Sequence, residues 1–240
     1  MAHLKGRERA TYVQQMFDEI APRYDLLNRL LSFGVDRRWR RIAVRQLVIP
    51  PHGRVLDVAT GTGDVALEIA RQTAPSVRIV GADFTQGMLV RGREKVAASP
   101  YRGRIELVNA PCEALPHPDG TFDGATIAFG IRNVVDRERG LGEMTRVLKP
   151  GGRLVVLEFA TPRTRLFRTV YLCYFHQLLP RLGGLLSRRS AYQYLPESVQ
   201  DFPDRQTFLG MMGAAGLTAL RHIDLTGGIA VVYVGEKPSG

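Results

Sequence analysis

The sequence predicts an α/β protein with a mostly parallel sheet, helices on both faces and an antiparallel hairpin at the C-terminal end. Three observations lead to this fold class. Short apolar runs alternate with segments of helical periodicity between residues 54 and 160, as expected for parallel strands joined by helices. A glycine turn, Thr60-Gly61-Thr62-Gly63, separates the first strand from the first helix there. The last two apolar runs are joined by Thr226-Gly227-Gly228, which is short enough only for a hairpin.

Helical segments form a predicted N-terminal cap, residues 1–50, in which Ser32-Phe33-Gly34 breaks a leucine-rich segment over 26–31. Apolar residues at i, i+3, i+4 and i+7 predict a helix that begins at Tyr12, and Pro22 stops it. The polar residues 1–10 are expected to fray. A basic helix is expected over 36–47, and its five arginines indicate either a solvent-exposed face or a phosphate-binding patch, of which we favour the exposed face.

Strands and helices alternate in the predicted core, residues 54–160. The expected strands are 54–59, 77–83, 104–109, 122–129 and 153–159. The expected helices are 64–73, 85–98 and 136–148, and Lys149-Pro150-Gly151-Gly152 is expected to turn. Because each helix connects two strands, the strands are predicted to be parallel, with helices on both faces of the sheet.

The chain changes character after the core. Residues 161–200 form a predicted insertion, in which 163–189 combine aromatic and aliphatic residues with arginines at both ends. This stretch indicates an interfacial helix, a lid over an apolar ligand, or a helix packed on the core. Residues 201–240 are expected to contain a helix over 204–215 and strands over 217–225 and 229–236, so that the whole chain forms one domain.

Composition sets the limits on compartment and partners. The 240 residues are 45% hydrophobic and 23% charged, as in ordinary globular proteins. The net charge of +10 suggests an anionic partner, such as nucleic acid or a membrane surface, or solubility alone. The two cysteines make no disulfide framework. There is no apolar leader and no apolar run of the ~18 residues that span a bilayer, so we expect a cytoplasmic protein.

The glycine turn and an acid at the end of the second strand predict a nucleoside-cofactor site. Gly61 and Gly63 allow a ligand to approach the backbone, and the N–H groups of the next helix face the same space. Asp83 can accept hydrogen bonds from both ribose hydroxyls. The turn also fits a dinucleotide-binding motif. However, the C-terminal hairpin and the lack of a hydride-transfer constellation argue against a dehydrogenase.

The chain resembles, over nearly its whole length, the quinone-ring C-methyltransferases of menaquinone and ubiquinone biosynthesis. The segments that carry the resemblance are 13–41, 55–64, 113–123, 129–159 and 192–204. Phe129-Gly-Ile-Arg-Asn133 and Arg23-Tyr-Asp25 are specific to that family, whereas the glycine turn and the 149–152 turn occur throughout the wider class. The resemblance implies a Rossmann-like class I methyltransferase fold with a seven-stranded sheet and S-adenosylmethionine as cofactor. It also implies a polyprenyl quinol as methyl acceptor.

The resemblance implies a role for each residue of the cofactor site. The amino-acid end of S-adenosylmethionine would lie against Asp57, Gly61, Thr62 and Gly63, and Asp83 would hold the ribose. The adenine would lie against Pro111, Cys112 and Glu113. Two positions depart from the family, because many relatives have Asp or Asn at Pro111 and some have Ser at Ala128. The adenine contact at Pro111 must come from elsewhere or be absent, and the hydroxyl contact at Ala128 is lost. We interpret Cys112 as a buried small apolar residue.

Methyl transfer from a sulfonium needs no metal, but the acceptor carbon must become nucleophilic through loss of a phenolic proton. We assign Arg132 to stabilise the developing phenolate and Asn133 to orient the ring or a water. The alternative for Arg132 is an ion pair with Asp136. Tyr24 and Asp25 resemble part of a cap over the cofactor, with Asp25 a candidate base or a helix N-cap. His176 is a second candidate base, or a structural histidine.

Partners and rival functions follow from the same features. A membrane-resident substrate implies transient contact of the protein with the inner face of the cytoplasmic membrane. Tyr192 and Tyr194 would line the ring pocket or pack in the core. The nearest rival is an RNA methyltransferase, although we expect no nucleic-acid partner; a non-catalytic cofactor-binding protein is the other. The turn sequence ATGTG, where many dual-function relatives have AGGTG, favours menaquinone. Tail length and oligomeric state stay open, with a homodimer as one alternative.

Overall fold

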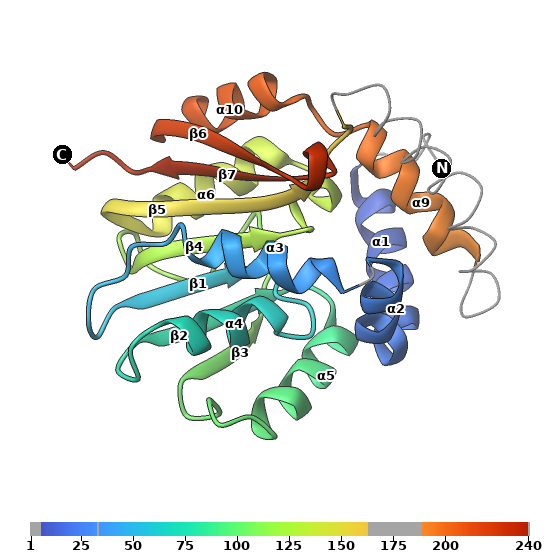
Figure 1. Ribbon diagram of the computed structural model, residues 1–240, viewed down its shortest axis with the longest axis horizontal. Helices are drawn as coiled ribbons and strands as arrows, with labels where there is room; N and C mark the ends of the chain where they lie inside the picture. Colours follow the sequence, from blue (N-terminus) through green and yellow to red (C-terminus); the bar gives the residue numbers. More distant parts are fainter. Residues whose placement is uncertain (1–5, 33, 163–188, 240) are drawn as a thin grey trace.

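The computed structural model describes residues 6–32, 34–162 and 189–239, which form a seven-stranded sheet covered by helices (Figure 1). The strands are β1 (Arg54–Val58), β2 (Arg78–Asp83), β3 (Ile105–Asn109), β4 (Phe122–Ala128), β5 (Leu148–Phe159), β6 (Thr218–Leu225) and β7 (Ala230–Glu236). Their order is β3-β2-β1-β4-β5-β7-β6. The first five strands are parallel, and β7 runs antiparallel to both β5 and β6. The predicted fold class is therefore confirmed.

The helices lie on both faces of the sheet and at its carboxyl edge (Figure 1). They are α1 (Gly6–Ile20), α2 (Tyr24–Leu31), α3 (Val35–Val44), α4 (Asp64–Gln72), α5 (Gln86–Ala97), α6 (Arg137–Val147), α9 (Arg189–Gln200) and α10 (Arg205–Ala214). Short 3-10 turns are η1 (Ala21–Arg23), η2 (Ile131–Asn133) and η4 (Thr226–Gly228). Apolar residues of α4 and α5 pack against one face of the sheet, and those of α6 and α10 pack against the other.

The strand order creates a crevice at the carboxyl edge. From β1 the chain runs outward through β2 and β3 and then returns to β4 on the other side of β1. Connections that leave neighbouring strands in opposite directions separate there, and this is where open α/β sheets bind ligands. The cap helices α1 and α2 stand beside this edge, next to α9 (Figure 1). The topology thus places the glycine turn, Asp83 and the segment after β4 around one space.

Burial explains why these segments form strands. Leu56, Ile127 and Val156 are fully buried at the centre of the parallel sheet. Strands covered on both faces read as nearly continuous apolar runs, and β1, β4 and β5 do so. Phe208 and Met212 of α10 are also fully buried.

Three elements, α1, β5 and α9, differ clearly from the prediction. Helix α1 begins at Gly6, so part of the segment expected to fray is helical. Strand β5 begins at Leu148 and includes the predicted turn, because Gly151 adopts a φ of +75° and the pairing with β4 shifts register between Phe122 and Gly124. Helix α9 was not predicted, since Pro196 lies inside it and proline normally interrupts a helix.

The five arginines of the predicted basic helix divide into four that are exposed and one that is buried. Arg37, Arg38, Arg41 and Arg45 are exposed, which confirms the solvent-exposed face. Arg40 is buried instead, and its guanidinium pairs with the carboxylates of Asp36 and Asp64. In the part of the chain that the structure describes, no helix is both long and apolar enough to cross a bilayer. Most of the predicted insertion, including His176, lies outside the described residues.

Candidate active site

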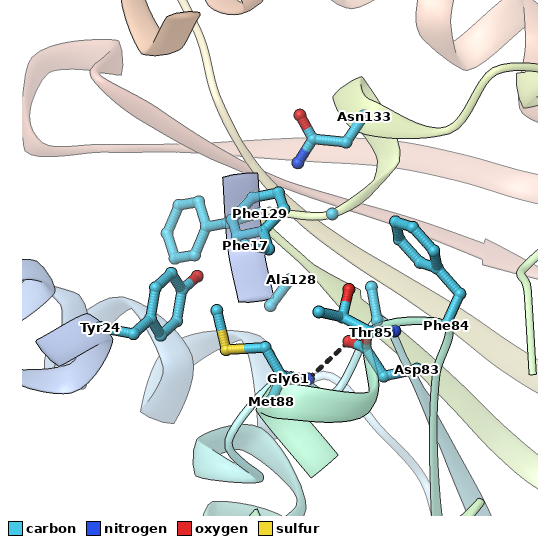
Figure 2. A pocket seen from close by; sticks show the side chains of 12 residues that line it. Phe17, Tyr24, Gly61, Asp83, Phe84, Thr85, Met88, Ala128, Phe129 and Asn133 are labelled. Atoms are coloured by element: carbon cyan, nitrogen blue, oxygen red, sulfur yellow. Dashed lines mark hydrogen bonds between the residues drawn. The ribbon is translucent and has the colours of Figure 1, made fainter. Parts of the chain in front are cut away.

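A pocket lies at the carboxyl ends of β1, β2 and β4, beneath the cap helices (Figure 2). Tyr24 lies on one side of it, Asp83 and Phe84 lie on another, and Asn133 approaches from a third (Figure 2). The complete lining is Phe17, Tyr24, Ala59, Gly61, Asp83, Phe84, Thr85, Met88, Ala128, Phe129, Gly130 and Asn133. Half-apolar walls with a few fixed polar groups are typical of a small-molecule site.

The glycine turn orients the Asp83 carboxylate. The Gly61 N–H donates a 2.8 Å hydrogen bond to Oδ2 of Asp83, and the Thr85 N–H donates a 2.8 Å bond to Oδ1. Gly61 has a φ of +56°, and the space beside its Cα is open. A carboxylate has about four acceptor positions, so Asp83 keeps acceptor capacity for a ligand in the pocket. These residues therefore fit the ribose and backbone-contact roles that a nucleoside cofactor requires.

Backbone strain occurs on both neighbouring strands at the pocket. Ala59 after β1 and Phe129 after β4 have φ angles of +52° and +56°, in the left-handed region that non-glycine residues rarely adopt. A Cβ on Gly130 would lie 2.5 Å from the Cβ of Ala59. The two strand ends thus meet so closely that only glycine fits at position 130. Such strain of about 1–3 kcal/mol per residue clusters at functional sites.

Asp57 lies behind the turn and does not line the pocket. Its carboxylate is 1% exposed and accepts hydrogen bonds from the hydroxyls of Thr60 (2.6 Å) and Thr126 (2.7 Å). Burial raises its pKa to about 6, although both hydroxyl donors oppose the shift. It links the turn to β4, whereas the predicted contact with the cofactor stays a prediction.

The raised pKa of Asp57 predicts a pH-dependent stability. The folded state holds the Asp57 proton more tightly than the unfolded chain, so this contribution to the free energy of unfolding is present below pH 3.8 and is lost as the pH rises through about 6. In the unchanged protein the free energy of unfolding should fall by on the order of 3 kcal/mol over this range, and in Asp57→Asn this fall should be absent. Urea unfolding of both proteins between about pH 4 and pH 7 measures how the free energy of unfolding depends on pH. Parallel pH profiles of the two would contradict it.

Arg132 is held by a buried ion pair rather than by Asp136. Its Nη1 lies 2.8 Å from Oε1 of Glu158 and donates to the carbonyl oxygen of Phe129 at 2.5 Å. Glu158 is 0% exposed and also accepts a 3.2 Å bond from the Arg132 N–H. Asp136 instead caps α6 by accepting from the Arg139 N–H. Arg132 borders the pocket residues without lining the pocket, so its predicted contact with the substrate stays a prediction.

Asn133 and Tyr24 present polar atoms to the pocket. The Tyr194 hydroxyl of α9 donates a 3.0 Å hydrogen bond to Oδ1 of Asn133, and the amide nitrogen of Asn133 lies on the pocket side (Figure 2). The Tyr24 hydroxyl points into the pocket (Figure 2). Burial raises the pKa of Tyr24, so its phenol stays protonated at neutral pH and is a hydrogen-bond donor. Tyr194 is buried against Val13 and Met16 of α1, which is the core-packing alternative.

Asp25 does not face the pocket. Its carboxylate accepts a 2.6 Å hydrogen bond from the Thr62 hydroxyl and lies 2.5 Å from Nζ of Lys95. Asp25 lies in the first turn of α2 rather than before it, so the N-cap alternative is wrong. The Thr62 side chain is therefore occupied by the cap, which leaves the turn backbone for a cofactor.

The loop after β3 is not part of the pocket lining. Pro111 is exposed, and Oε1 of Glu113 accepts from the N–H groups of Val135 and Asp136. Cys112 is buried beside Gly140, and burial raises the pKa of its thiol, which supports the interpretation of a small core residue. The predicted adenine contacts of these residues stay predictions.

Five of the predicted site residues line the pocket: Tyr24, Gly61, Asp83, Ala128 and Asn133. Sequence reasoning missed its aromatic wall, Phe17, Phe84 and Phe129, and also Glu158. Phe84 directly follows Asp83, so its place at a strand end was a usable signal. Glu158 is a carboxylate within the apolar second half of β5, and a buried charge of this kind requires a partner.

Comparisons with known proteins place the chain in a family. The model of the ubiE/COQ5 methyltransferase family matches residues 5–237. The chain belongs to this family. It is 63% identical over 230 residues to the ubiquinone/menaquinone biosynthesis C-methyltransferase UbiE of Geobacter sulfurreducens, covering 96% of this chain and 90% of the relative. It is 53% identical over 225 residues to the demethylmenaquinone methyltransferase of Thermus thermophilus, covering 93% and 100% of the two chains.

Family membership and fold agree. A SAM-dependent methyltransferase structure from Thermotoga maritima superposes with a TM-score of 0.65 at 20% identity, covering 93% of this chain and 99% of that one. The chain is therefore a methyltransferase with S-adenosylmethionine as its cofactor. The carboxylate of Asp83, the open turn at Gly61 and the aromatic wall fit this cofactor.

Proposed function

We propose that this methyltransferase transfers the methyl group of S-adenosylmethionine to a ring carbon of a polyprenyl quinol, with demethylmenaquinol as the main acceptor. One observation carries the proposal. In a chain of this family, the same pocket is lined by Asp83, the acid expected to bind the cofactor ribose, and by two uncharged hydrogen-bond donors, Tyr24 and Asn133. The relatives named for quinone C-methylation, at 53% and 63% identity, support the same acceptor class.

The pocket residues stabilise the acceptor in its reactive form. S-adenosylmethionine, when bound, supplies an electrophilic methyl group, so no residue has to activate the donor. A hydroquinol ring carbon becomes nucleophilic when a neighbouring phenol loses its proton. The Tyr24 hydroxyl and the Asn133 amide can donate hydrogen bonds to the resulting phenolate. This stabilisation lowers the pKa of the acceptor hydroxyl and favours loss of its proton to water. After the methyl transfer, the methylated ring carbon loses its own hydrogen as a proton, which restores the aromatic ring and the phenol.

Arg132 has a positioning role in this proposal. Glu158 balances its charge, so the guanidinium acts less on the phenolate than an unpaired cation would. It holds the Phe129 carbonyl and the turn that presents Asn133. The protonated Tyr24 and the amide of Asn133 therefore take over the electrostatic role that the sequence assigned to Arg132.

We also propose that the protein meets an anionic membrane surface to reach its substrate. A polyprenyl tail keeps the quinol in the bilayer, and a net charge of +10 favours anionic headgroups. The exposed Arg37, Arg38 and Arg41 of α3, with Arg45 directly after it, add a basic surface within the described chain. Each basic side chain near such a surface contributes about 1 kcal/mol of attraction.

Methyl transfer from labelled S-adenosylmethionine tests both proposals in one assay. Reduced demethylmenaquinol and a demethylated ubiquinol precursor are each presented in zwitterionic and in anionic vesicles. We expect label on the naphthoquinol, with faster transfer in anionic vesicles that slows as salt is added. Label on both acceptors would make the enzyme bifunctional. Label on neither, with cofactor binding intact, would reject the quinol and favour RNA as acceptor. Equal rates in both vesicle types would reject the surface contact alone.

A further inference from the structure

A cluster of charged side chains lies behind the glycine turn, outside the pocket. Nζ of Lys95 is 2.5 Å from Oδ2 of Asp25, 2.6 Å from Oδ1 of Asp64 and 3.1 Å from Oγ1 of Thr62. The Thr62 hydroxyl in turn donates to Oδ1 of Asp25 at 2.6 Å. An ammonium group has three donors, and here each one has an acceptor.

The members of this cluster come from four separate parts of the fold. Lys95 belongs to α5, Asp25 to the cap helix α2, Asp64 to the first turn of α4, and Thr62 to the glycine turn. Asp64 is also 3.1 Å from Arg40 of α3. Although burial alone would raise the pKa of Asp64, Arg40 and Lys95 lower it, so the carboxylate is charged at neutral pH. Lys95 is thus the point at which the cap, the turn and two helices are tied together.

The cluster contributes more to geometry than to overall stability. The side chains of Lys95, Asp25 and Asp64 are 28%, 36% and 36% exposed. Solvent screens ion pairs of this exposure, and such pairs typically add little to folding stability. However, the residue directly before Asp25 is Tyr24, whose hydroxyl faces the pocket. Thr62, which Asp25 contacts, lies between the two glycines of the turn. A small shift of Asp25 therefore moves both a pocket wall and the cofactor turn.

A second contact holds the cap to the other cofactor segment. Oδ1 of Asp18 on α1 accepts a 2.7 Å hydrogen bond from the Gly87 N–H at the start of α5. Nε2 of Gln14 donates to the Phe84 carbonyl, directly after Asp83, at 3.2 Å. The cap is thus anchored on both segments that shape the cofactor site, and the Lys95 cluster is the anchor on the glycine turn.

We propose that Lys95 and Asp25 are positioning residues that couple docking of the cap helix α2 to the cofactor-ready conformation of the glycine turn. Asp25 acts here through Thr62 and Lys95, in place of the base role considered from the sequence. The proposal rests on the proposed function, because it assumes that the pocket binds S-adenosylmethionine for methyl transfer. It predicts that cofactor affinity and cap docking fall together when the pair is broken.

Lys95→Met tests the coupling, because it keeps most of the side-chain volume and removes the charge. Calorimetry with S-adenosylmethionine on the full chain should show about tenfold weaker binding, equivalent to the loss of one modest polar interaction. Lys149→Met is the matched control. Nζ of Lys149 pairs with Asp123 at 2.8 Å, and Asp123 lies at the start of β4, the end of the strand away from the pocket. We expect the control to bind as the unchanged protein does. Asp25→Asn, which is isosteric, should repeat the Lys95→Met result, and the double variant should lose little more.

Amide hydrogen exchange separates coupling from a general loss of structure. In the unchanged protein, S-adenosylmethionine should slow exchange in residues 6–31 and in the glycine turn. In Lys95→Met at saturating cofactor, the turn should still be protected and the cap should not. Unchanged affinity and cap protection in Lys95→Met, or losses that simply add in the double variant, would overturn the proposal. Failure of the unchanged protein to bind the cofactor would instead overturn the proposed function.

Discussion

Arg132→Met is expected to lower the free energy of unfolding by about 3–5 kcal/mol, because it leaves the fully buried Glu158 carboxylate without its guanidinium partner. Removing one member of a buried ion pair costs more than the pair contributes, since the remaining charge cannot regain its hydration. Chemical denaturation at neutral pH measures the change. Methyl transfer should fall as well, because the Phe129 carbonyl loses its guanidinium donor directly before the turn that carries Asn133.

Two further variants make the Arg132 result specific. In Arg132→Met/Glu158→Gln, the side chain at position 158 carries no charge and its one oxygen can still accept from one of the two neighbouring N–H groups, so part of the lost stability should return. Turnover should stay low, which would separate the positioning role from the electrostatic cost. Arg205→Met is the control on another ion pair, because its partner Asp224 is 34% exposed and can be hydrated. An Arg132→Met protein as stable as the unchanged one would contradict the analysis.

Asp83→Ala is expected to weaken S-adenosylmethionine binding by about 10²- to 10⁴-fold. Two hydrogen bonds to a charged acceptor, each contributing about 1.5–3 kcal/mol, are lost from the ribose contact. The Gly61 and Thr85 N–H groups also lose the acceptor that fixes the turn. Calorimetry with the cofactor measures the effect, and thermal unfolding without cofactor shows whether the fold persists.

Asp83→Asn and Asp18→Ala define what the Asp83 result means. Asparagine keeps one acceptor oxygen and the side-chain shape, so we expect a loss between those of the unchanged protein and Asp83→Ala. Asp18 accepts from the Gly87 N–H close by but does not line the pocket, so Asp18→Ala should change affinity much less than Asp83→Ala. Binding by Asp83→Ala within about threefold of the unchanged protein would be below the loss of a single hydrogen bond and would remove Asp83 from the cofactor site.

Several elements show which parts of this site a linear pattern can predict. Gly61 and Asp83 were predictable because a strand end, a glycine turn and a second strand end are local features, and parallel topology then brings them to one edge. The Arg132 partner was not, because Asp136 lies four residues away on the chain, whereas Glu158 reaches Arg132 only through the pairing of β4 and β5. The ion pair of Asp25 with Lys95 could not be predicted either, because Lys95 lies 70 residues further along the chain and meets Asp25 only when the cap docks.

The sequence by itself determined the alternation of strands and helices in the core, the C-terminal hairpin, the glycine turn, the place of Asp83 at a strand end and the family. These depend on periodicity, turn residues and motifs, which are written within a few residues of one another. Only the tertiary structure decided which charges are paired, which aromatic side chains wall the pocket, and that Asp25 faces Lys95 rather than the substrate space. The physical reason is that burial and pairing depend on the folded neighbours of a side chain, and no local pattern specifies those neighbours.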